Sequence, residues 1–418
     1  MSGQSTGPEP TSSSGPTAAS DQSYLKKSSG SSSMMWIAVV AIVVVIALIG
    51  AAYGLGWFTK GNNKSGNGYE PPCASLGGAG STFVYPIMAV WVTQYATLAC
   101  SANSGFSQVQ VNYLSVGSGT GITDLTGRVV YFGASDAPLS PAQQALLPGK
   151  VVTFPESAGA VTLTYHVNKL QGLNLTGPIL AAIYLGQITN WNVSAITSIN
   201  PGVVIPTLPI VPVVRADGSG TTFAFTSYLS AENTTWKSTI GAATKVSFPT
   251  VSGEIGAIGS EGVAGAVATT NGAIGYVELN YAEEEGANVG IAKILNPAGN
   301  YIAPTVADTA LAVNAISSFP QPTDNWSGFS ILNQPGAGTY PIATFTYIFV
   351  YEDLTTIYKA VTQPIAQALV SFLWWITHDG QTSATGLFYV PLPSLVVTSV
   401  CEPALQDITY NGAAQPSH

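Results

Sequence analysis

A short glycine–serine turn recurs in this chain, each time between a strand-like apolar run and a helix-like segment. It reads Gly-Ser-Thr-Phe at residues 80–83 and Gly-Ser-Gly-Thr at both 117–120 and 218–221. Strands that alternate with helices are typical of α/β proteins. Further runs such as "VVYFGAS", "AVTLTYHV", "GAIGYVEL" and "ATFTYIFVY" extend the pattern. The alternation therefore predicts an α/β fold.

The start of a helix offers unpaired backbone N–H groups and the positive end of the helix dipole. A Ser or Thr hydroxyl adds a donor there, and glycine lets the backbone approach closely, so such turns bind phosphate and similar anions. Ordinary N-capping is the simpler explanation of any single turn. Three glycine-flanked copies, one of them joined to an arginine, favour an anion site.

The third turn, in "RADGSGT", carries the arginine. The guanidinium of Arg215 presents a fixed fork of donors that matches two oxygens of an oxyanion. Asp217 can hold that fork by accepting its other N–H groups; the alternative is a surface ion pair of little consequence. Asp136, in "FGASDAP", would repel an anion that has no proton to donate. Phosphate is protonated at neutral pH and sulfate is not, so Asp136 predicts discrimination between them, unless it only caps a turn.

Composition and motifs exclude several functions. The chain has 21 acidic and 12 basic residues, and only 8% of its residues are charged, against about 25% in an average protein. No basic cluster is present, so we expect no nucleic-acid partner. P-loop, G-x-S-x-G and H-E-x-x-H motifs are absent and the only histidines are His166, His378 and His418, so we expect no enzyme activity, cofactor or metal. The enzymatic alternative is a phosphate-ester hydrolase that uses Ser219 or Asp136.

Residues 34–58, "MMWIAVVAIVVVIALIGAAYGLGWF", contain no charged side chain and exceed the roughly 20 apolar residues that cross a bilayer. This length favours an uncleaved transmembrane anchor over a cleaved signal peptide, whose apolar core has about 7–15 residues. We expect residues 1–33 to be a disordered cytoplasmic tail and residues 59–72 a linker. Residues 73–418 then form a large extracellular domain of a single-pass protein of the cell membrane.

Five Asn-x-Ser/Thr sequons and all three cysteines follow the apolar stretch, as an extracellular domain requires. The possible glycosylation sites are Asn63, Asn174, Asn192, Asn233 and Asn325. The cysteines are Cys73, Cys100 and Cys401. They predict one disulfide and one free thiol, and the sequence leaves the pairing open.

The turns and strands together resemble a known family. The strings "GAGSTFVYPIMAVW", "GSGTGI", "FGASDAPLS", "IYLGQITNWN", "VVRADGSGTTFAFTSYL" and "GAIGYVEL" occur in the order seen in the substrate-binding protein of the phosphate ABC transporter. The resemblance implies a two-lobed type II periplasmic-binding-protein fold, preceded here by a single transmembrane helix. Lobe I would comprise about residues 73–157 and 343–418, and lobe II about 158–342, with a hinge near Val161 and Thr344.

By the same resemblance, phosphate is held in the cleft by backbone N–H groups, hydroxyls, an arginine and one carboxylate. The matching positions are Thr82, Phe83, Ser118, Asp136, Arg215, Ser219, Gly220 and Thr221, with Asp217 bracing Arg215. Relatives often have a second serine where this chain has Gly119, and Thr120 is the candidate to supply that hydroxyl. Cys73 lies too far beyond the apolar stretch for a lipobox, and the anchor and sequons resemble an archaeal surface protein.

The resemblance implies extracellular, high-affinity binding of inorganic phosphate and its delivery to ABC permease subunits. Arsenate and sulfate are alternative ligands, and a structural surface or filament protein that keeps the fold without a ligand is an alternative of another class. In an acidic medium phosphate carries two protons, and Asp136 can accept only one. We then expect either a backbone carbonyl as second acceptor or an affinity that weakens as pH falls.

Overall fold

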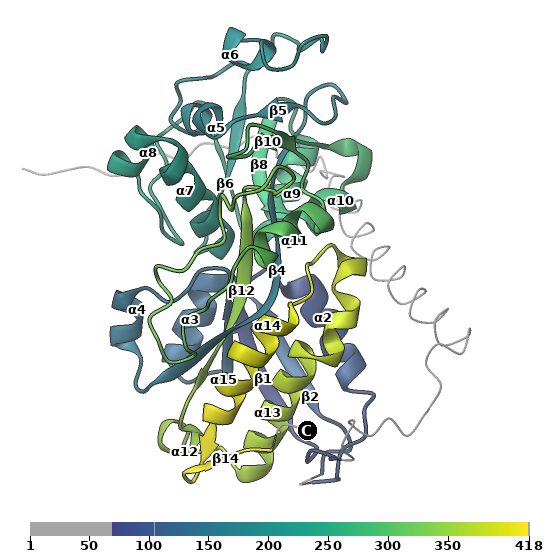
Figure 1. Cartoon of the computed structure of the whole chain (residues 1–418), viewed down its shortest axis with the longest axis vertical. Helices are drawn as coiled ribbons and strands as arrows, with labels where there is room; N and C mark the ends of the chain where they lie inside the picture. Colours follow the sequence, from purple (N-terminus) through teal and green to yellow (C-terminus); the bar gives the residue numbers. More distant parts are fainter. Residues whose placement is uncertain (1–68, 104, 417–418) are drawn as a thin grey trace, which may run out of the picture. The chain divides into compact units, whose positions relative to one another are not determined.

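The computed structural model describes residues 69–103 and 105–416, shown in colour in Figure 1. The expected tail (1–33), anchor (34–58) and most of the linker (59–72), together with the sequon at Asn63, lie outside these residues. Within residues 69–103 and 105–416, no helix is both long and apolar enough to cross a membrane.

A nine-stranded sheet runs through the centre of the described chain, in the order β2-β1-β3-β12-β4-β8-β6-β7, with β9 paired to β4. Its strands are β1 Ser75–Gly80, β2 Gln110–Ser115, β3 Phe132–Ser135, β4 Val151–Tyr165, β6 Val211–Arg215, β7 Ile255–Ala257, β8 Ala273–Glu278, β9 Gly290–Ile291 and β12 Ala343–Tyr351. These strands contain the apolar runs picked out in the sequence, and the expected α/β class is confirmed.

The long strand β4 belongs to both halves of this sheet. It pairs with β12 from Val151 to Ala160 and with β8 from Val161 to Tyr165, antiparallel in both cases. We call β2, β1, β3 and β12 sheet I, and β8, β6 and β7 sheet II. Figure 1 shows sheet I in the lower part of the view and sheet II in the upper part, with β4 running between them.

Each sheet contains the same three-stranded parallel unit. Strands β1, β2 and β3 lie in the order β2-β1-β3, and β6, β7 and β8 lie in the equivalent order β7-β6-β8. The connecting helices are α2 (Tyr85–Tyr95) and α3 (Ser118–Thr126) in the first unit, and α7 (Gly220–Glu232), α8 (Thr234–Thr239) and α9 (Gly259–Thr269) in the second. In each unit the two connections run in opposite directions along the sheet, so right-handed crossovers place their helices on opposite faces.

The directions of the strands bring the two units into opposition. Strand β12 is antiparallel to both β3 and β4, and β4 is in turn antiparallel to β8. The first unit therefore points toward sheet II and the second points toward sheet I. The carboxyl ends of the three strands of one unit consequently face those of the other unit where β4 crosses between the sheets.

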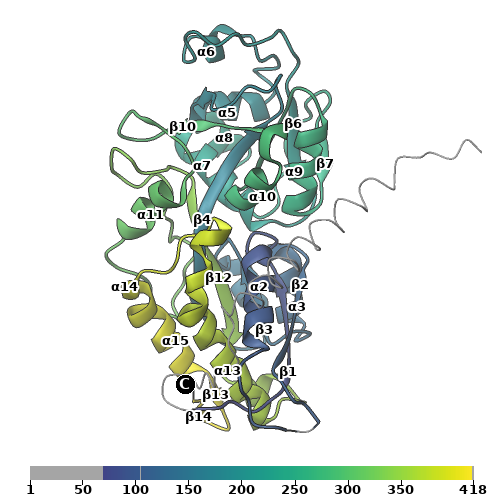
Figure 2. The ribbon, with the colours of Figure 1, turned by 90° about the vertical axis from the view of Figure 1, so that its right-hand side faces the viewer.

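The remaining elements lie outside the central sheet; β5, β10 and β11 form a small sheet of their own, as do β13 and β14. The other helices are α4 Pro141–Leu146, α5 Gly177–Tyr184, α6 Ser194–Thr197, α10 Leu279–Glu284, α11 Val306–Asn314, α12 Leu354–Ile357, α13 Gln363–Thr377, α14 Ser394–Val396 and α15 Glu402–Asp407. The short strands are β5 Asn174–Leu175, β10 Lys293–Leu295, β11 Tyr301–Ile302, β13 Thr409–Tyr410 and β14 Ala413–Ala414. Figure 2 shows the C-terminal helices α13, α14 and α15 beside the lower half.

Two long-range links fasten the N-terminal unit. A disulfide joins Cys73, just before β1, to Cys100, after α2, and Cys401 is a buried free thiol, so the expected count of one disulfide and one thiol is confirmed. The indole N–H of the fully buried Trp91 in α2 donates to the carbonyl of Gly380 at 2.7 Å. Burying so large an aromatic side chain stabilises the fold by about 1.5–3 kcal/mol.

Candidate anion-binding site

The residues predicted to bind an anion lie at the carboxyl ends of the strands of the two opposed units. Thr82 and Phe83 follow β1, Ser118 follows β2, Asp136 follows β3, and the "RADGSGT" turn follows β6. All the named side chains at these positions are buried, among them Asp136 at 2% and Arg215 at 5% exposure. In open α/β sheets the crevice outside the carboxyl ends of the strands is where ligands bind.

Two of the helix starts touch each other across the sheets. The backbone N–H of Gly220 donates to Ser118 Oγ at 3.0 Å, and that of Gly119 donates to the carbonyl of Gly218 at 3.0 Å. A Cβ at position 220 would come within 2.6 Å of Asp136 atoms, so only glycine allows this approach. The two halves are therefore closed on one another at the helix starts.

A second group of contacts joins the end of β1 to the second unit. Thr82 Oγ1 lies 2.9 Å from the hydroxyl of Ser260, and the phenol of Tyr281 donates to the carbonyl of Thr82 at 2.9 Å. The backbone N–H of Phe83 donates to Ser81 Oγ at 2.9 Å. Ser260 was not predicted from the sequence, although Gly259 and Ser260 make a further Gly-Ser pair at the start of a helix that follows a strand.

Arg215 is held rigidly by its own loop. Its Nε and Nη2 donate to the two carboxylate oxygens of Asp217 at 2.8 and 2.5 Å, and its Nη1 donates to Ser260 Oγ at 3.2 Å. Burial of Asp217 works to raise its pKa, but the hydrogen bonds and charge of Arg215 outweigh this and lower it. This bidentate ion pair fixes the plane of the guanidinium at the centre of the site.

Asp136 supplies the carboxyl group that the first unit contributes to the site. The hydroxyl of Ser81 donates to its Oδ1 at 2.5 Å. Burial, followed by the negative charge of Glu278, raises the pKa of Asp136 to about 7, while Ser81 and Arg215 lower it. Asp136 can therefore change its protonation state near neutral pH.

Two further glutamates are buried and were not predicted from the sequence. Glu278 ends β8, and its Oε1 accepts the hydroxyl of Thr221 at 2.5 Å. Glu156 lies inside β4, where the pairing with β12 shifts register and leaves it as the extra residue of a bulge; its Oε1 accepts from Thr346 Oγ1 at 3.0 Å. Burial raises the pKa of Glu156 to about 8. An acidic residue within an otherwise uncharged strand is the sequence signal that could have identified both.

Thr120 does not join the site, contrary to our expectation. It is the third residue of α3 and is exposed, whereas Ser118, the first residue of that helix, is buried. Successive helical residues point about 100° apart, so a hydroxyl two positions later faces another direction.

The glycosylation sites predicted within the described residues differ in accessibility. Asn192 and Asn325 are exposed. Asn174 and Asn233 are half-buried and use their side chains, Asn174 to bond the carbonyl of Ile199 and Asn233 to cap α8.

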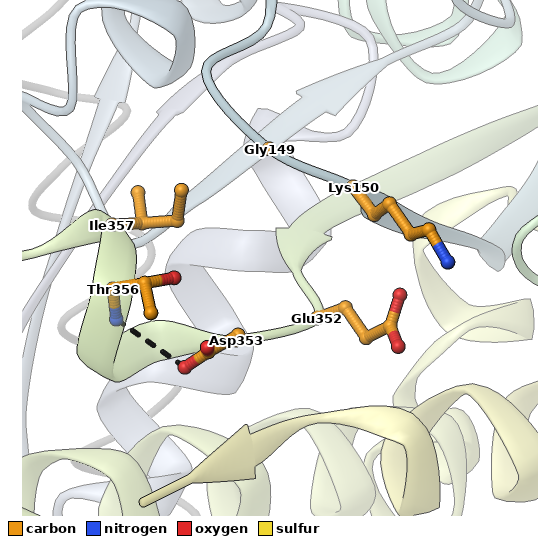
Figure 3. Close-up of a pocket in the computed structure, with 6 residues that line it drawn as sticks. All are labelled: Gly149, Lys150, Glu352, Asp353, Thr356 and Ile357. Carbon is orange, nitrogen blue, oxygen red and sulfur yellow. Dashed lines mark hydrogen bonds between the residues drawn. The ribbon is translucent and has the colours of Figure 1, made fainter. Parts of the chain in front are cut away.

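A separate pocket lies at the far end of sheet I. It has a volume of about 170 Å³ and is lined by Gly149, Lys150, Glu352, Asp353, Thr356 and Ile357 (Figure 3). It contains none of the residues predicted from the sequence, and Asp353 serves there as the cap of α12. Within residues 69–103 and 105–416, no group of three or more His, Cys, Asp and Glu side chains is arranged to hold a metal.

Comparison with known proteins gives matches of three kinds. Residues 65–379 match the family described as the PBP superfamily domain. The phosphate-binding protein PstS of Xylella fastidiosa is 34% identical over 355 residues, which cover 81% of this chain and 89% of that protein. PstS of Methanocaldococcus jannaschii is 31% identical over 333 residues, covering 77% and 83%. A solved periplasmic phosphate-binding protein bound with phosphate superposes with a TM-score of 0.62 at 20% identity, covering 82% of this chain and 100% of that one; this likeness shows the fold.

Proposed function

This chain belongs to the family of PstS phosphate-binding proteins, and on that premise we propose that it binds inorganic phosphate outside the cell and delivers it to an ABC permease. The observation that carries the proposal is the meeting of helix starts, the Arg215–Asp217 pair and one carboxyl group at the carboxyl ends of the strands of the two opposed units. A buried arginine, hydroxyls and backbone N–H groups are the donors that a tetrahedral oxyanion needs.

We assign the contacts with phosphate to the residues predicted from the sequence. They are Thr82, Phe83, Ser118, Asp136, Arg215, Ser219, Gly220 and Thr221, with Asp217 as the brace of Arg215. Two observations support this assignment: these side chains are buried together, and donors such as Gly220 N–H bond across to the opposite half. Phosphate oxygens would take the place of those acceptors when the halves close around the anion.

Asp136 would distinguish phosphate from sulfate. Ser81 donates to one oxygen of its carboxylate, and we assign the other oxygen as the acceptor of the proton that the ligand carries. Sulfate has no such proton at neutral pH and would face an unpaired, negatively charged acceptor, which costs binding free energy. Arsenate is protonated as phosphate is, and we expect it to compete.

The protein's place at the membrane is part of the proposal. Residues 34–58 are the anchor, residues 1–33 the tail inside, and the domain from residue 73 lies outside, with the lobes dividing near residues 158 and 343. The disulfide Cys73–Cys100 supports an oxidising compartment, and the exposed sequon asparagines Asn192 and Asn325 support glycosylation there.

Calorimetric titration of the detergent-solubilised full chain with phosphate, arsenate and sulfate tests the proposal. Arg215→Ala should abolish phosphate binding, because it removes the fork and leaves the half-buried Asp217 without its cation. Arg128→Ala is the matched control, since Arg128 is exposed at the end of α3. Asp136→Asn should narrow the difference between phosphate and sulfate.

Two outcomes would overturn the proposal. Absence of heat with all three anions would favour a structural surface protein whose helix starts are only capped. Turnover of a chromogenic phosphate ester, lost in Ser219→Ala, would favour a hydrolase.

A further inference from the structure

The two three-stranded units place an acidic residue at the same topological position. In the first unit Asp136 directly follows β3, its third strand; in the second, Glu278 ends β8, again the third strand. Both side chains are buried, at 2% and 1% exposure. Since the units oppose each other across the crossing of β4, the two carboxyl groups approach the site from opposite halves.

Each acidic residue is also bonded in the same way. Ser81, after the first strand of its unit, donates its hydroxyl to Asp136 Oδ1 at 2.5 Å. Thr221, after the first strand of the other unit, donates its hydroxyl to Glu278 Oε1 at 2.5 Å. In Glu278 one carboxylate oxygen is thereby occupied, and the other, the buried Oε2, is left without a hydrogen-bond partner among the described residues.

The bond to Glu278 changes what Thr221 can offer to an anion. A hydroxyl has one proton, and Thr221 gives that proton to Glu278, so the side toward the anion presents lone pairs. Thr221 and Glu278 together therefore offer acceptors, whereas the backbone N–H groups around them offer donors. An acceptor at an anion site is useful only if the anion brings a proton.

We propose that Glu278, together with Thr221, is the second proton acceptor of the anion site, so that the site takes phosphate as dihydrogen phosphate, with one proton toward Asp136 and one toward Glu278. This inference rests on the proposed function and specifies the protonation state of its ligand. It proposes a side-chain acceptor as a third possibility beside the two expected from the sequence, a backbone carbonyl or an affinity that weakens as pH falls.

The charges around Glu278 favour a singly charged ligand. The charged or titratable groups that interact with it are Arg215 in β6, Asp136 after β3, Tyr281 in α10 and Tyr389. Arg215 already shares its charge with Asp217, and burial raises the pKa of both phenols well above the ordinary value, so they stay neutral. Burial raises the pKa of Glu278 as well. A phosphate dianion would therefore face the carboxylates of Asp136 and Glu278, with only part of the charge of Arg215 to offset the repulsion.

The number of protons taken up on binding tests this inference directly. We would titrate the full chain with inorganic phosphate at about pH 8.5, where free phosphate carries one proton, in buffers of different ionisation enthalpy. The unsubstituted protein should take up about one proton more than Glu278→Gln. Above neutral pH its affinity should fall by up to about tenfold per pH unit, and that of Glu278→Gln should fall much less.

Three further variants separate this role from a structural one. Thr221→Ser should keep the additional proton uptake on phosphate binding, and Thr221→Val should lose it. These two variants test the inference independently if Glu278→Gln fails to fold. Glu156→Gln is the matched control, because Glu156 is an equally buried glutamate that accepts from a threonine hydroxyl. An equal loss of proton uptake in Glu156→Gln would overturn the inference, since any buried charge would then suffice.

The inference can fail while the proposed function stands. Tight phosphate binding with the same proton uptake in Glu278→Gln and in the unsubstituted protein would overturn the inference alone. A uniform loss of affinity at every pH, with proton uptake unchanged, would assign Glu278 a structural role. Absence of phosphate binding to the unsubstituted protein would overturn the function and the inference together.

Discussion

The same four residues, Gly-Ser-Gly-Thr, occur at 117–120 and 218–221 and fold differently. In the first copy the helix begins at Ser118, and Gly117 is the N-cap with φ of 85°. In the second copy the helix begins one residue later, at Gly220, and Ser219 is the N-cap with φ of −129°. The first serine therefore faces the opposite half, whereas the second bonds the N–H of Thr222 in its own helix.

This offset of one residue decides which threonine reaches the site. Thr120 is the third residue of its helix and is exposed; Thr221 is the second of its helix, buried at 1% and bonded to Glu278. The two copies also stand at different places, after the second strand of one unit and after the first strand of the other. Position in the fold, more than local sequence, sets the role of each hydroxyl.

The largest effect is expected at Asp136, which contacts both copies: its N–H approaches Ser118 Oγ at 3.4 Å, and its side chain lies against Gly220. Its folded-state pKa of about 7 exceeds the ordinary value of 3.8. The folded state therefore binds more protons between these values, and the stability of the protein falls as pH rises from about 4 to 7.

Asp136→Asn cannot ionise, so it should be more stable than the unsubstituted protein at pH 8, by at most about 4 kcal/mol. Urea denaturation without phosphate, at several pH values, measures this. Asp124→Asn on α3 serves as control and should change little. Lower stability of Asp136→Asn at pH 8 would contradict the stated cause of the shift.

Replacing each threonine separates the two copies directly. Thr221→Val removes the hydroxyl from a buried glutamate and should cost about 1–3 kcal/mol of unfolding free energy. Thr120→Val, at an exposed position, should stay within about 0.5 kcal/mol. Denaturant unfolding at one pH compares them, and equal costs would mean that the offset between the copies has no energetic consequence.

Substituting the first glycine of each copy should give the reverse order, with the larger loss of stability in the copy at 117–120. Gly117→Ala places a side chain at positive φ, which costs about 1–2 kcal/mol, and its Cβ would lie 2.6 Å from Asp217 Oδ2. Gly218→Ala has no such φ, and its Cβ would lie 3.1 Å from Gly119 Cα. We expect Gly117→Ala to lower both stability and phosphate affinity more than Gly218→Ala, as thermal unfolding and calorimetry can check. The reverse order would contradict the assignment of the N-cap to Gly117.

The smallest effect concerns the serines as helix caps. Ser219→Ala should cost about 1 kcal/mol, and Ser219→Gly only a few tenths, because glycine tolerates the cap position. Ser118 does not cap its own helix with its side chain, so Ser118→Gly should give no such recovery of α3 over Ser118→Ala. The hydrogen-exchange rates of the first backbone amides of α7 and of α3 measure the local stability of each helix start. Recovery at both serines would contradict the difference between the two copies.

The sequence predicted the fold class, the strands and the residues that meet at their ends, because alternating apolar runs and Gly-Ser turns are local patterns. It also suggested the partnership of Arg215 and Asp217, two residues apart. It did not show Thr120 turned outward, since that depends on one residue of helix register. Glu278 and Glu156 each stand out locally as the one acidic residue of a strand, but their burial follows from strand pairing and from a bulge, which the local sequence does not show.

The return of β12 to the sheet has a consequence for how the molecule is made. The second unit, β6 to β8, is assembled from one continuous stretch of chain, whereas β3 pairs with β12, more than half the domain away in sequence. Such distant pairings form slowly, and domains begin to fold during synthesis from the N-terminal side. The second unit can therefore mature while sheet I still awaits its last strand, and the two halves can oppose each other only after β12 has been synthesised.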